Sequence, residues 1–406
     1  MATDYVILRS LTPLPAQPPA FSFGQSTRFG AIARGGTPVQ FRVNVEGLEQ
    51  GDLAKVARDP QVACIAQAMP IKLIRPTESG PAPASAQTMG AAWGVEAVGA
   101  TRSTFDGNGV TVAVLDTGID KDHEAFKGVN LVEKDFTGDG TGDLQGHGTH
   151  CAGTIFGRDV GGNRIGIARG VQKALIGKVL GNDGSGGTGA LFSGMSWALE
   201  EGAQVISMSL GFDFPGMSAM LQKKGWPADL ATSTALEAYR GNLRLFDALM
   251  AVIKTKGALG GGTIVVAASG NESRRDIAAN YRIAKSLPSA ADDVVAVGAV
   301  GVQGDKLAVA PFSNSMPVLC APGVAIISAR AGGRGPASET LAAMSGTSMA
   351  APHVAGVATL WWQKVNAGPG AKNASTVLAN LVARASTTRL AGTNEDDYGS
   401  GLATAP

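Results

Sequence analysis

The sequence predicts an α/β fold, a mostly parallel sheet with helices on both faces, preceded by a small α+β domain. From Trp93 onward, short apolar runs alternate with stretches of helical length. Such runs are typical of parallel strands, which are buried on both faces and therefore lack polar alternation. The clearest are Val110–Leu115, Ala174–Leu180, Gln204–Met208, Thr263–Ala268 and Val294–Val300.

Composition excludes several classes of protein. Lys+Arg 34 against Asp+Glu 33 gives a formal net charge of +1, so no overall field favours nucleic acid or an anionic membrane as a partner. An apolar share of 44% excludes wholesale disorder. No apolar run reaches the roughly 18 residues of a transmembrane helix. The 56 glycines indicate many tight turns and close backbone approaches.

Residues 1–75 are predicted to form the small domain. Its expected elements are three strands and one helix, at Tyr5–Leu8, Val39–Val45, Val62–Ile74 and Asp52–Ala57. A Pro-rich loop at 12–19 interrupts them. Residues 76–92 have the small residues and prolines of a linker, and residues 93–406 form the large domain. Within the large domain, the helical stretch Ala228–Lys256 suggests a surface insertion to which no chemistry is assigned.

The cysteines indicate the expected compartment. Cys64, Cys151 and Cys320 are too few for a disulfide framework, and their spacing matches no zinc pattern. Such sparse use suits a reducing compartment. The first residues lack the basic-then-apolar layout of a signal peptide. We therefore expect a cytoplasmic protein, or a secreted one if a leader has been removed.

Reactive side chains follow the apolar runs. Asp116 ends one run before a glycine, where a turn-forming role and an active-site role are both open. His147 and His150 stand in a glycine-flanked segment. Their spacing differs from that of helical zinc ligands and no glutamate accompanies them, which disfavours a metal and favours His147 as an exposed base. Asn271 follows a third run and is either a turn residue or an amide donor facing a cleft.

Ser348 lies where a long helix is expected to begin, continuing to Trp361 and Trp362. The N-terminus of a helix offers free backbone N–H groups and the positive end of its dipole. Negative charge that develops beside the serine oxygen would be stabilised there. Taken alone, a serine at this position is ordinarily a helix cap.

Taken together, these segments resemble the subtilisin-like serine proteases, the subtilases. The resemblance rests on Asp116, His147 and Ser348 in that chain order. It also rests on their motifs, Asp-Thr-Gly, Gly-His-Gly-Thr-His-Cys-Ala-Gly and Ser-Gly-Thr-Ser-Met-Ala-Ala-Pro-His-Val-Ala-Gly. It extends from Trp93 to Leu402, and a cysteine directly after the histidines is similar to the proteinase K branch.

The resemblance implies a serine endopeptidase that acts on polypeptides through an acyl-enzyme. Ser348 would be the nucleophile, His147 the general base and then acid, and Asp116 the residue that orients the imidazole. The side-chain amide of Asn271 and the backbone N–H of Ser348 would bind the oxyanion.

Substrates would bind as an added β-strand. By resemblance, the substrate-binding residues are Gly184, Ser185, Gly186, Ser209, Leu210, Gly211, Ala268, Ser269, Gly270 and Ser286. The last seven surround the primary pocket, with Ser286 near its base. Because none of them is acidic, we expect an apolar or aromatic residue before the scissile bond.

The chemistry requires no cofactor. A structural calcium ion is conceivable, because Asp135, Asp139 and Asp143 offer carboxylates, but their spacing is not that of an EF-hand. In the loop Phe156–Ile165, two arginines stand where oxygen ligands are expected. No ligand set is therefore assigned.

Two other classes of function stay open. One is a catalytically silent binding protein on the same scaffold. The other is a dinucleotide enzyme, which the sequence disfavours. Its Gly-rich runs, Gly138–Gly142 and Gly181–Gly189, lack the strand–G-x-G-x-x-G–helix context.

Residues 1–75 resemble the family's N-terminal propeptide, chiefly at Asp52–Ile65, whereas the prolines and glycines of 12–36 depart from it. The resemblance implies an intramolecular inhibitor and folding chaperone. Its exit segment, Ala66–Arg75, would run through the cleft toward Ser348 as a product-like strand. An accessory domain packed elsewhere is the alternative.

Overall fold

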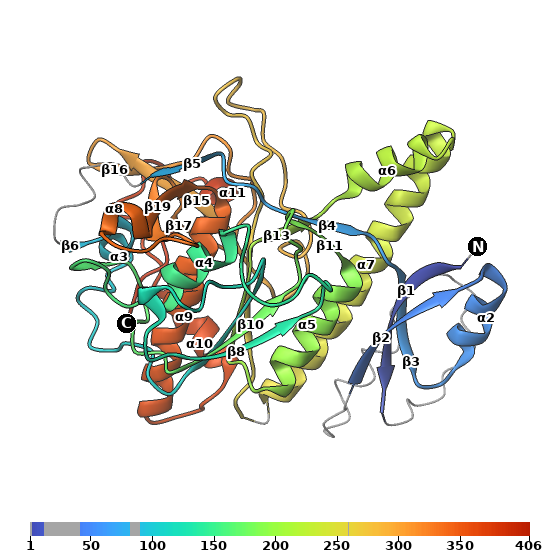
Figure 1. The fold of residues 1–406 in the computed structure, drawn as a ribbon, viewed down its shortest axis with the longest axis horizontal. Coiled ribbons are helices and arrows are strands. Elements are labelled where there is room, and N and C mark those ends of the chain that lie inside the picture. The colour runs from blue at the N-terminus through green and yellow to red at the C-terminus, as the bar shows by residue number, and fades with distance from the viewer. Residues whose placement is uncertain (1, 12–40, 82–89, 259) are drawn as a thin grey trace.

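The computed structural model describes residues 2–11, 41–81, 90–258 and 260–406 (Figure 1). Its centre is an eight-stranded sheet in the order β16-β15-β14-β12-β7-β10-β8, with β17 paired to β15. All pairs are parallel except β15 with β16. The strands are β7 (Thr111–Asp116), β8 (Asn130–Asp135), β10 (Lys173–Lys178), β12 (Val205–Met208), β14 (Ile264–Ala268), β15 (Val295–Gln303), β16 (Lys306–Val309) and β17 (Leu319–Pro322).

Helices cover both faces of this sheet, which confirms the predicted fold class (Figure 1). Val112 and Val114 of β7 pack toward α4 and α9, whereas Ala113 and Leu115 pack toward α5 and α7. Alternate residues of a strand point to opposite faces, so a continuous apolar run satisfies both layers. The principal helices are α4 (His147–Phe156), α5 (Thr188–Glu200), α7 (Ala228–Ala258), α9 (Thr347–Ala367) and α10 (Ala374–Ala383).

Short elements complete the large domain. They are β6 (Gly90–Ala91), α3 (Trp93–Ala97), η2 (Glu124–Phe126), β9 (Asn163–Arg164), β11 (Ser185–Gly187), β13 (Leu210–Phe212), α6 (Phe214–Lys223), β18 (Ile326–Ala329), α8 (Ala337–Thr340), β19 (Leu341–Ser345) and α11 (Glu395–Tyr398).

The N-terminal residues form a separate three-stranded antiparallel sheet, ordered β2-β1-β3, with one helix. Its elements are β1 (Thr3–Ser10), β2 (Phe41–Leu48), α2 (Gln50–Arg58) and β3 (Val62–Gln67). It packs on α5 and α7, where Asn242 Nδ2 donates to Gln67 O at 2.7 Å and Val45 lies against Gly189. The loop predicted at 12–19 and the segment 12–36 lie outside the described residues.

The chain between the two domains differs from the sequence prediction. The single strand expected at Val62–Ile74 is divided, because β3 ends at Gln67 and a second strand, β4 (Pro70–Leu73), leaves the small sheet. Part of the predicted linker is also a strand, β5 (Glu78–Pro81), which pairs with β19. Residues 82–89 of that linker lie outside the described residues.

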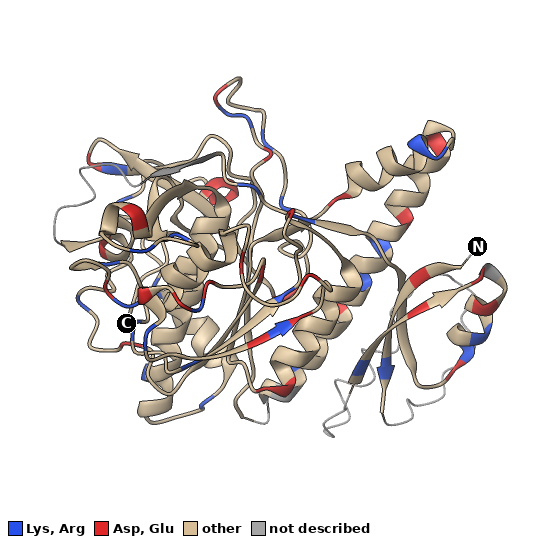
Figure 2. Ribbon diagram, viewed as in Figure 1, with Lys and Arg blue, Asp and Glu red and all other residues tan. Residues whose placement is uncertain are grey.

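The surface insertion predicted at Ala228–Lys256 is only partly one (Figure 1). α6 and the first turns of α7 form a hairpin that projects from the molecule, whereas most of residues 245–253 of α7 are buried in the core against the sheet. Positive and negative side chains are interspersed over both domains (Figure 2). Among the described residues, every helix is too short or too polar to cross a lipid bilayer.

Candidate active site

Asp116 and His147 form a buried pair at the carboxyl edge of the sheet. Asp116 ends β7, and His147 is the first residue of α4. His147 Nδ1 lies 2.8 Å from Asp116 Oδ1, and each side chain is 1% exposed. A carboxylate accepts the Nδ1 hydrogen in this arrangement, which leaves Nε2 as the basic atom.

Local packing fixes this pair. A Cβ on Gly148 would lie 2.2 Å from Gly118 O, so only glycine lets the first turn of α4 approach the turn that follows β7. Asp143 accepts hydrogen bonds from the backbone N–H groups of Gly146 and Thr149, at 2.7 and 2.9 Å, and so satisfies free donors of the helix start. The Thr117 hydroxyl donates to the same carboxylate at 2.9 Å.

The pKa values of the two neighbouring histidines are shifted in opposite directions. Burial alone would lower the pKa of His147, but the adjacent Asp116 carboxylate raises it well above its ordinary value. Burial lowers the pKa of His150 to about 3. His150 Nε2 donates to Ile326 O at 3.0 Å, so this neutral side chain joins α4 to β18. The structure thus separates a polarised imidazole from a structural one.

Ser348 is the second residue of α9 and is fully buried. Its hydroxyl donates to the carbonyl oxygen of Ile74 at 2.9 Å. His147 Nε2 has no hydrogen-bond partner among the described residues. In this state, therefore, the serine proton is directed to a peptide oxygen rather than to the imidazole.

Asn271 follows β14 and is held by the residue next to the serine. Its Oδ1 accepts hydrogen bonds from the backbone N–H and the hydroxyl of Thr347, both at 2.9 Å. The amide Nδ2 consequently faces the cleft, where it donates to Arg75 O at 3.0 Å. Thr347 also accepts from the N–H of Gly270 at 3.1 Å.

Sequence reasoning missed Thr347 and Lys178. The only signal for Thr347 was its place beside Ser348. Lys178 is 2% exposed, and its Nζ donates to the carbonyl of Thr117 at 2.6 Å, behind Asp116. A lysine at the end of a buried strand was visible in the sequence, but its partner was not.

The two predicted substrate-binding segments enclose a strand of the chain itself. β4 lies between β11 and β13 and is antiparallel to both. The pairing continues beyond β4, since Leu73 N donates to Gly184 O at 2.8 Å and Ile74 N to Ser209 O at 3.4 Å. We call residues 70–81 the strap.

The strap places Ile74 in the predicted primary pocket. The residue is 5% exposed. A Cβ on Gly211 would lie 3.6 Å from its Cγ1 and 3.9 Å from Ser286 Oγ. The predicted Ala268 and Ser269 are buried where β14 ends, Gly270 follows them, and Leu210 pairs with Leu73 of the strap.

Beyond the serine, the strap pairs with a different part of the large domain. Thr77 N donates to Ser345 O at 2.8 Å, and β5 then runs antiparallel to β19. The strap is therefore bound on both sides of Ser348. It passes Ser348 as one uninterrupted polypeptide.

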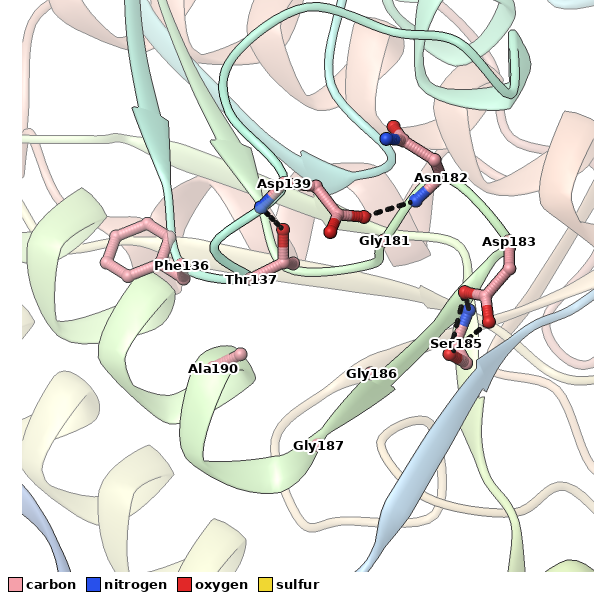
Figure 3. Close-up of a pocket in the computed structure, with 10 residues that line it drawn as sticks. All are labelled: Phe136, Thr137, Asp139, Gly181, Asn182, Asp183, Ser185, Gly186, Gly187 and Ala190. Carbon is pink, nitrogen blue, oxygen red and sulfur yellow. Dashed lines mark hydrogen bonds between the residues drawn. The ribbon is translucent and has the colours of Figure 1, made fainter.

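A pocket of about 580 Å³ adjoins the outer side of β11 (Figure 3). Its lining includes Phe136, Asp139, Asp183 and Ser185, and among the described residues none from the strap. Asp139 accepts from Asn182 N at 2.8 Å, and Asp183 accepts from the hydroxyl of Ser185 at 2.7 Å. These carboxylates hold the loop that carries β11, the strand predicted to bind substrate.

The carboxylates considered for calcium do not gather into a common cluster: among the described residues, the one group of three potential metal ligands includes none of them. Asp143 is occupied by the start of α4, and Asp139 by Asn182 N. Asp135 accepts from Thr137 N at 2.8 Å and from Gly140 N at 2.9 Å. Each carboxylate thus accepts hydrogen bonds from N–H or O–H groups of the protein.

Within the described residues, Asp116, His147 and Cys151 are the one group of three whose ligand atoms lie within 4.8 Å of one another. Cys151 Sγ is 3.7 Å from His147 Nδ1 and 3.4 Å from Ser348 O. The thiol is buried, and burial raises its pKa. A thiol held in its neutral form is a poor nucleophile.

Comparison with known proteins gives a consistent result. The subtilase family profile matches residues 107–401. "Subtilisin-like protease 1" of Arthroderma gypseum is 34% identical over 284 residues, 66% of this chain and 48% of the relative. The protein of that name from Trichophyton equinum is 31% identical over 328 residues, 76% of this chain and 52% of the relative.

"Subtilisin-like protease 6" of Trichophyton soudanense is 34% identical over 301 residues, 71% of this chain and 63% of the relative. The matched region spans about half the length of the first of these curated relatives. The profile match covers most of the large domain and includes Asp116, His147, Asn271 and Ser348. On this match, the chain belongs to the subtilase family.

Proposed function

We propose that the chain is a serine endopeptidase that hydrolyses peptide bonds through an acyl-enzyme on Ser348. The observation that carries the proposal is the buried Asp116–His147 pair beside a serine that touches a bound peptide carbonyl. The names of the curated relatives support the same activity.

Each residue has a defined task in this reaction. His147 Nε2 takes the proton of Ser348 as Oγ attacks the carbonyl carbon of the substrate, and then gives it to the leaving amine. Asp116 keeps the imidazole in the tautomer with Nδ1 protonated and stabilises the imidazolium. Asn271 Nδ2 donates to the oxyanion, and water then hydrolyses the ester.

The silent binding protein is the alternative, and active-site labelling separates the two. A fluorophosphonate reacts with a serine only when a base activates it. We expect the full chain to be labelled at Ser348 and to cleave an unstructured peptide, and Ser348→Ala to lose both properties. Ser400→Ala, which removes an exposed serine, is the matched control. A folded chain that neither reacts nor cleaves would establish the binder.

We further propose that the N-terminal domain inhibits the enzyme in the intact chain. The strap belongs to the segment that leaves this domain, and it fills the substrate cleft on both sides of Ser348. Inhibition then follows from competition, because a tethered strand has a very high effective concentration.

A charge in the primary pocket tests this inhibitory role. Ile74→Asp would bury a carboxylate in an apolar site, so the strap should leave and peptide hydrolysis by the full chain should rise at least tenfold. Leu11→Asp changes an exposed residue of the same domain and should leave the rate unchanged. Equal rates for Ile74→Asp and the unaltered chain would refute inhibition and leave the peptidase proposal standing.

A further inference from the structure

The strap shows how the cleft meets each side chain of a bound strand. Ile71, Leu73 and Ile74 are buried, whereas Lys72 is 50% exposed. With Ile74 in the primary pocket, Lys72 stands third upstream of the bond presented to Ser348. Its Nζ lies 2.8 Å from Asp213 Oδ1.

Asp213 is held in place independently of this lysine. Its backbone N donates to Pro70 O at 2.9 Å, which extends the pairing of β13 with the strap. Its carboxylate caps α6 by accepting from Gly216 N at 3.2 Å. A Cβ on Gly216 would lie 1.9 Å from Asp213 Oδ2, so glycine is required for this position of the carboxylate.

The contact between Lys72 and Asp213 connects the projecting hairpin to the substrate cleft. Asp213 is the junction between β13 and α6, and its side chain is 22% exposed. Because Asp213 caps α6, its carboxylate is held at the edge of the cleft as a preorganised negative charge. A side chain that points away from the pockets would meet it.

We propose that Asp213 selects a basic side chain third upstream of the scissile bond, within extended polypeptides whose neighbouring side chains are apolar. The proposal rests on the proposed peptidase function and defines its substrate class. An exposed ion pair gives a modest preference, and charge reversal adds repulsion, so we expect discrimination of about fivefold between Lys and Glu.

Competition between two peptides measures this preference. The peptides are Met-Pro-Ile-Lys-Leu-Ile-Ser-Ala and its counterpart with Glu in place of Lys, mixed in one reaction. Their ratio of kcat/KM does not depend on how much enzyme has an open cleft. The full chain carrying Ile74→Asp should favour the Lys peptide about fivefold, addition of Asp213→Asn should bring the ratio near one, and addition of Asp213→Lys should invert it.

Asp229→Asn is the matched control, because it neutralises an exposed aspartate on the same hairpin. It should leave the ratio unchanged. If the chain that carries Ile74→Asp and retains Asp213 cleaves both peptides equally, the proposed selection by Asp213 is overturned and the peptidase proposal stands. If neither peptide is cleaved, by this chain or by the chain without Ile74→Asp, the proposed function itself fails.

A second measurement leaves the primary pocket intact. In the full chain, Lys72→Glu sets two carboxylates against each other and should loosen the strap, so hydrolysis of an added peptide should rise. Lys72→Glu combined with Asp213→Lys restores an attractive pair and should return the rate toward its original value. Additive effects of the two changes would argue against direct recognition.

A separate observation concerns the bond that the strap presents to Ser348. Hydrolysis of Ile74–Arg75 requires the Ile74 oxygen to lie against the oxyanion donors. Instead, that oxygen accepts from Ser348 Oγ, and Asn271 Nδ2 is occupied by the next carbonyl, that of Arg75. The reacting carbonyl therefore lacks this donor.

Pro76 accounts for this misplacement. Upstream of the serine, pairing ends with the N–H of Ile74, and downstream it resumes with the N–H of Thr77. Proline has no N–H, so residue 76 cannot donate to Ser345 O and the bond passes to the following residue. The strap therefore carries one more residue across the catalytic centre than pairing through residue 76 would need.

We infer that Pro76 keeps the strap as an uncleaved inhibitor. Productive pairing would let Ser348 Oγ attack the Ile74 carbonyl carbon, pass its proton through His147 to the Arg75 nitrogen and release that amine. Water would then hydrolyse the Ile74 ester. In the observed pairing, the Ile74 carbonyl does not have the geometry that attack by Ser348 Oγ requires.

Mass spectrometry of the intact chain tests this inference. The unaltered chain should remain uncut between Ile74 and Arg75, whereas Pro76→Ala, which supplies the N–H, and deletion of Pro76, which advances Thr77, should be cut there. Combining either change with Ser348→Ala should abolish the cut.

Pro70→Ala, which changes a proline elsewhere in the strap, is the control and should stay uncut. Cleavage of the unaltered chain at Ile74–Arg75 would overturn the inference. The same holds if both Pro76 variants remain uncut while the chain carrying Ile74→Asp hydrolyses an added peptide. If the Ile74→Asp chain also fails to cleave that peptide, the result counts against the proposed function instead.

Discussion

In the proposed reaction His147 must be neutral to take the proton of Ser348, so its pKa would set the acid limit. Burial opposes the imidazolium, but the Asp116 carboxylate overcomes this and raises the pKa of His147 well above its ordinary value. The raised pKa means that the protonated, inactive form persists to higher pH. The acidic limb of kcat/KM should therefore have its midpoint above 6.5.

A pH–rate profile from pH 5 to 9 checks this midpoint in the chain carrying Ile74→Asp. Adding Asp116→Asn removes the charge that raises the pKa, so the limb should move to lower pH while kcat falls by about 10⁴. A limb at or below pH 6.5 before the Asp116 change would contradict the assigned pair.

Thr347 should act through Asn271 rather than on the substrate. Thr347→Val keeps the backbone N–H bond to Asn271 but removes the hydroxyl bond, so the amide loses part of its orientation. Because the oxyanion contact strengthens in the transition state, kcat should fall about tenfold with little change in KM. Thr347→Ser retains the hydroxyl and should recover most of the rate. A change confined to KM would place Thr347 in substrate binding instead.

Some site residues can be predicted from the sequence, and others cannot. Asp116, His147 and Ser348 each stand in a motif at the end of a strand or the start of a helix, and the structure places the first two in contact and the third on the bound strap. Asp213 and Thr347 were not found, because their roles depend on partners distant in the chain. The roles of all these side chains remain predictions.

At the scale of elements, the five predicted parallel strands of the large sheet were confirmed because burial on both faces leaves continuous apolar runs. The sequence predicts a linker where β5 lies, since the partner strand β19 is more than two hundred and fifty residues away in the chain. Small residues and prolines do not reveal such pairing.

In the loop after α4, arginine side chains donate hydrogen bonds to backbone carbonyl oxygens. Arg164 Nη2 donates to Ile167 O at 3.1 Å, and Arg158 Nη2 to Val171 O at 2.7 Å. These guanidinium groups supply positive charge to carbonyl oxygens, the ligand type that calcium prefers. The two arginines that depart from the family pattern in this loop thus bind backbone carbonyl oxygens.

We predict that Arg164→Met destabilises the full chain by about 1–3 kcal/mol, because a charged hydrogen-bond donor is lost. Treatment with EDTA should change the unfolding temperature much less. Arg102→Met, at an exposed arginine, should have no measurable effect. Thermal unfolding of the three chains with and without EDTA provides the measurement. An EDTA effect as large as that of Arg164→Met would indicate a bound metal instead.

Across the whole molecule, the stability towards acid should depend on two neutral, buried histidines. Burial lowers the pKa of His150 to about 3 and that of His353 to about 4. His353 lies inside α9, where its Nδ1 donates to Met349 O at 2.8 Å, and it packs against Gly94 of α3. Both side chains therefore join separate layers of the large domain while uncharged.

The sign of the pH dependence follows from the unfolded state. An unfolded histidine binds a proton below about pH 6.5, whereas these two do not bind one until about pH 4 and 3. Their contribution to stability is complete above pH 6.5 and is lost as pH falls from there. His147, with its raised pKa, is protonated in both states below pH 6.5 and adds no slope in that range.

Between pH 6 and 5, the free energy of unfolding should fall by about 1 kcal/mol for each histidine, or by about 2 kcal/mol for both. Urea unfolding of the Ser348→Ala chain, which cannot digest itself, measures this slope. His353→Gln removes one titrating group and should roughly halve it, whatever its effect on absolute stability. A slope that stays the same in His353→Gln would show that other groups govern the response to acid.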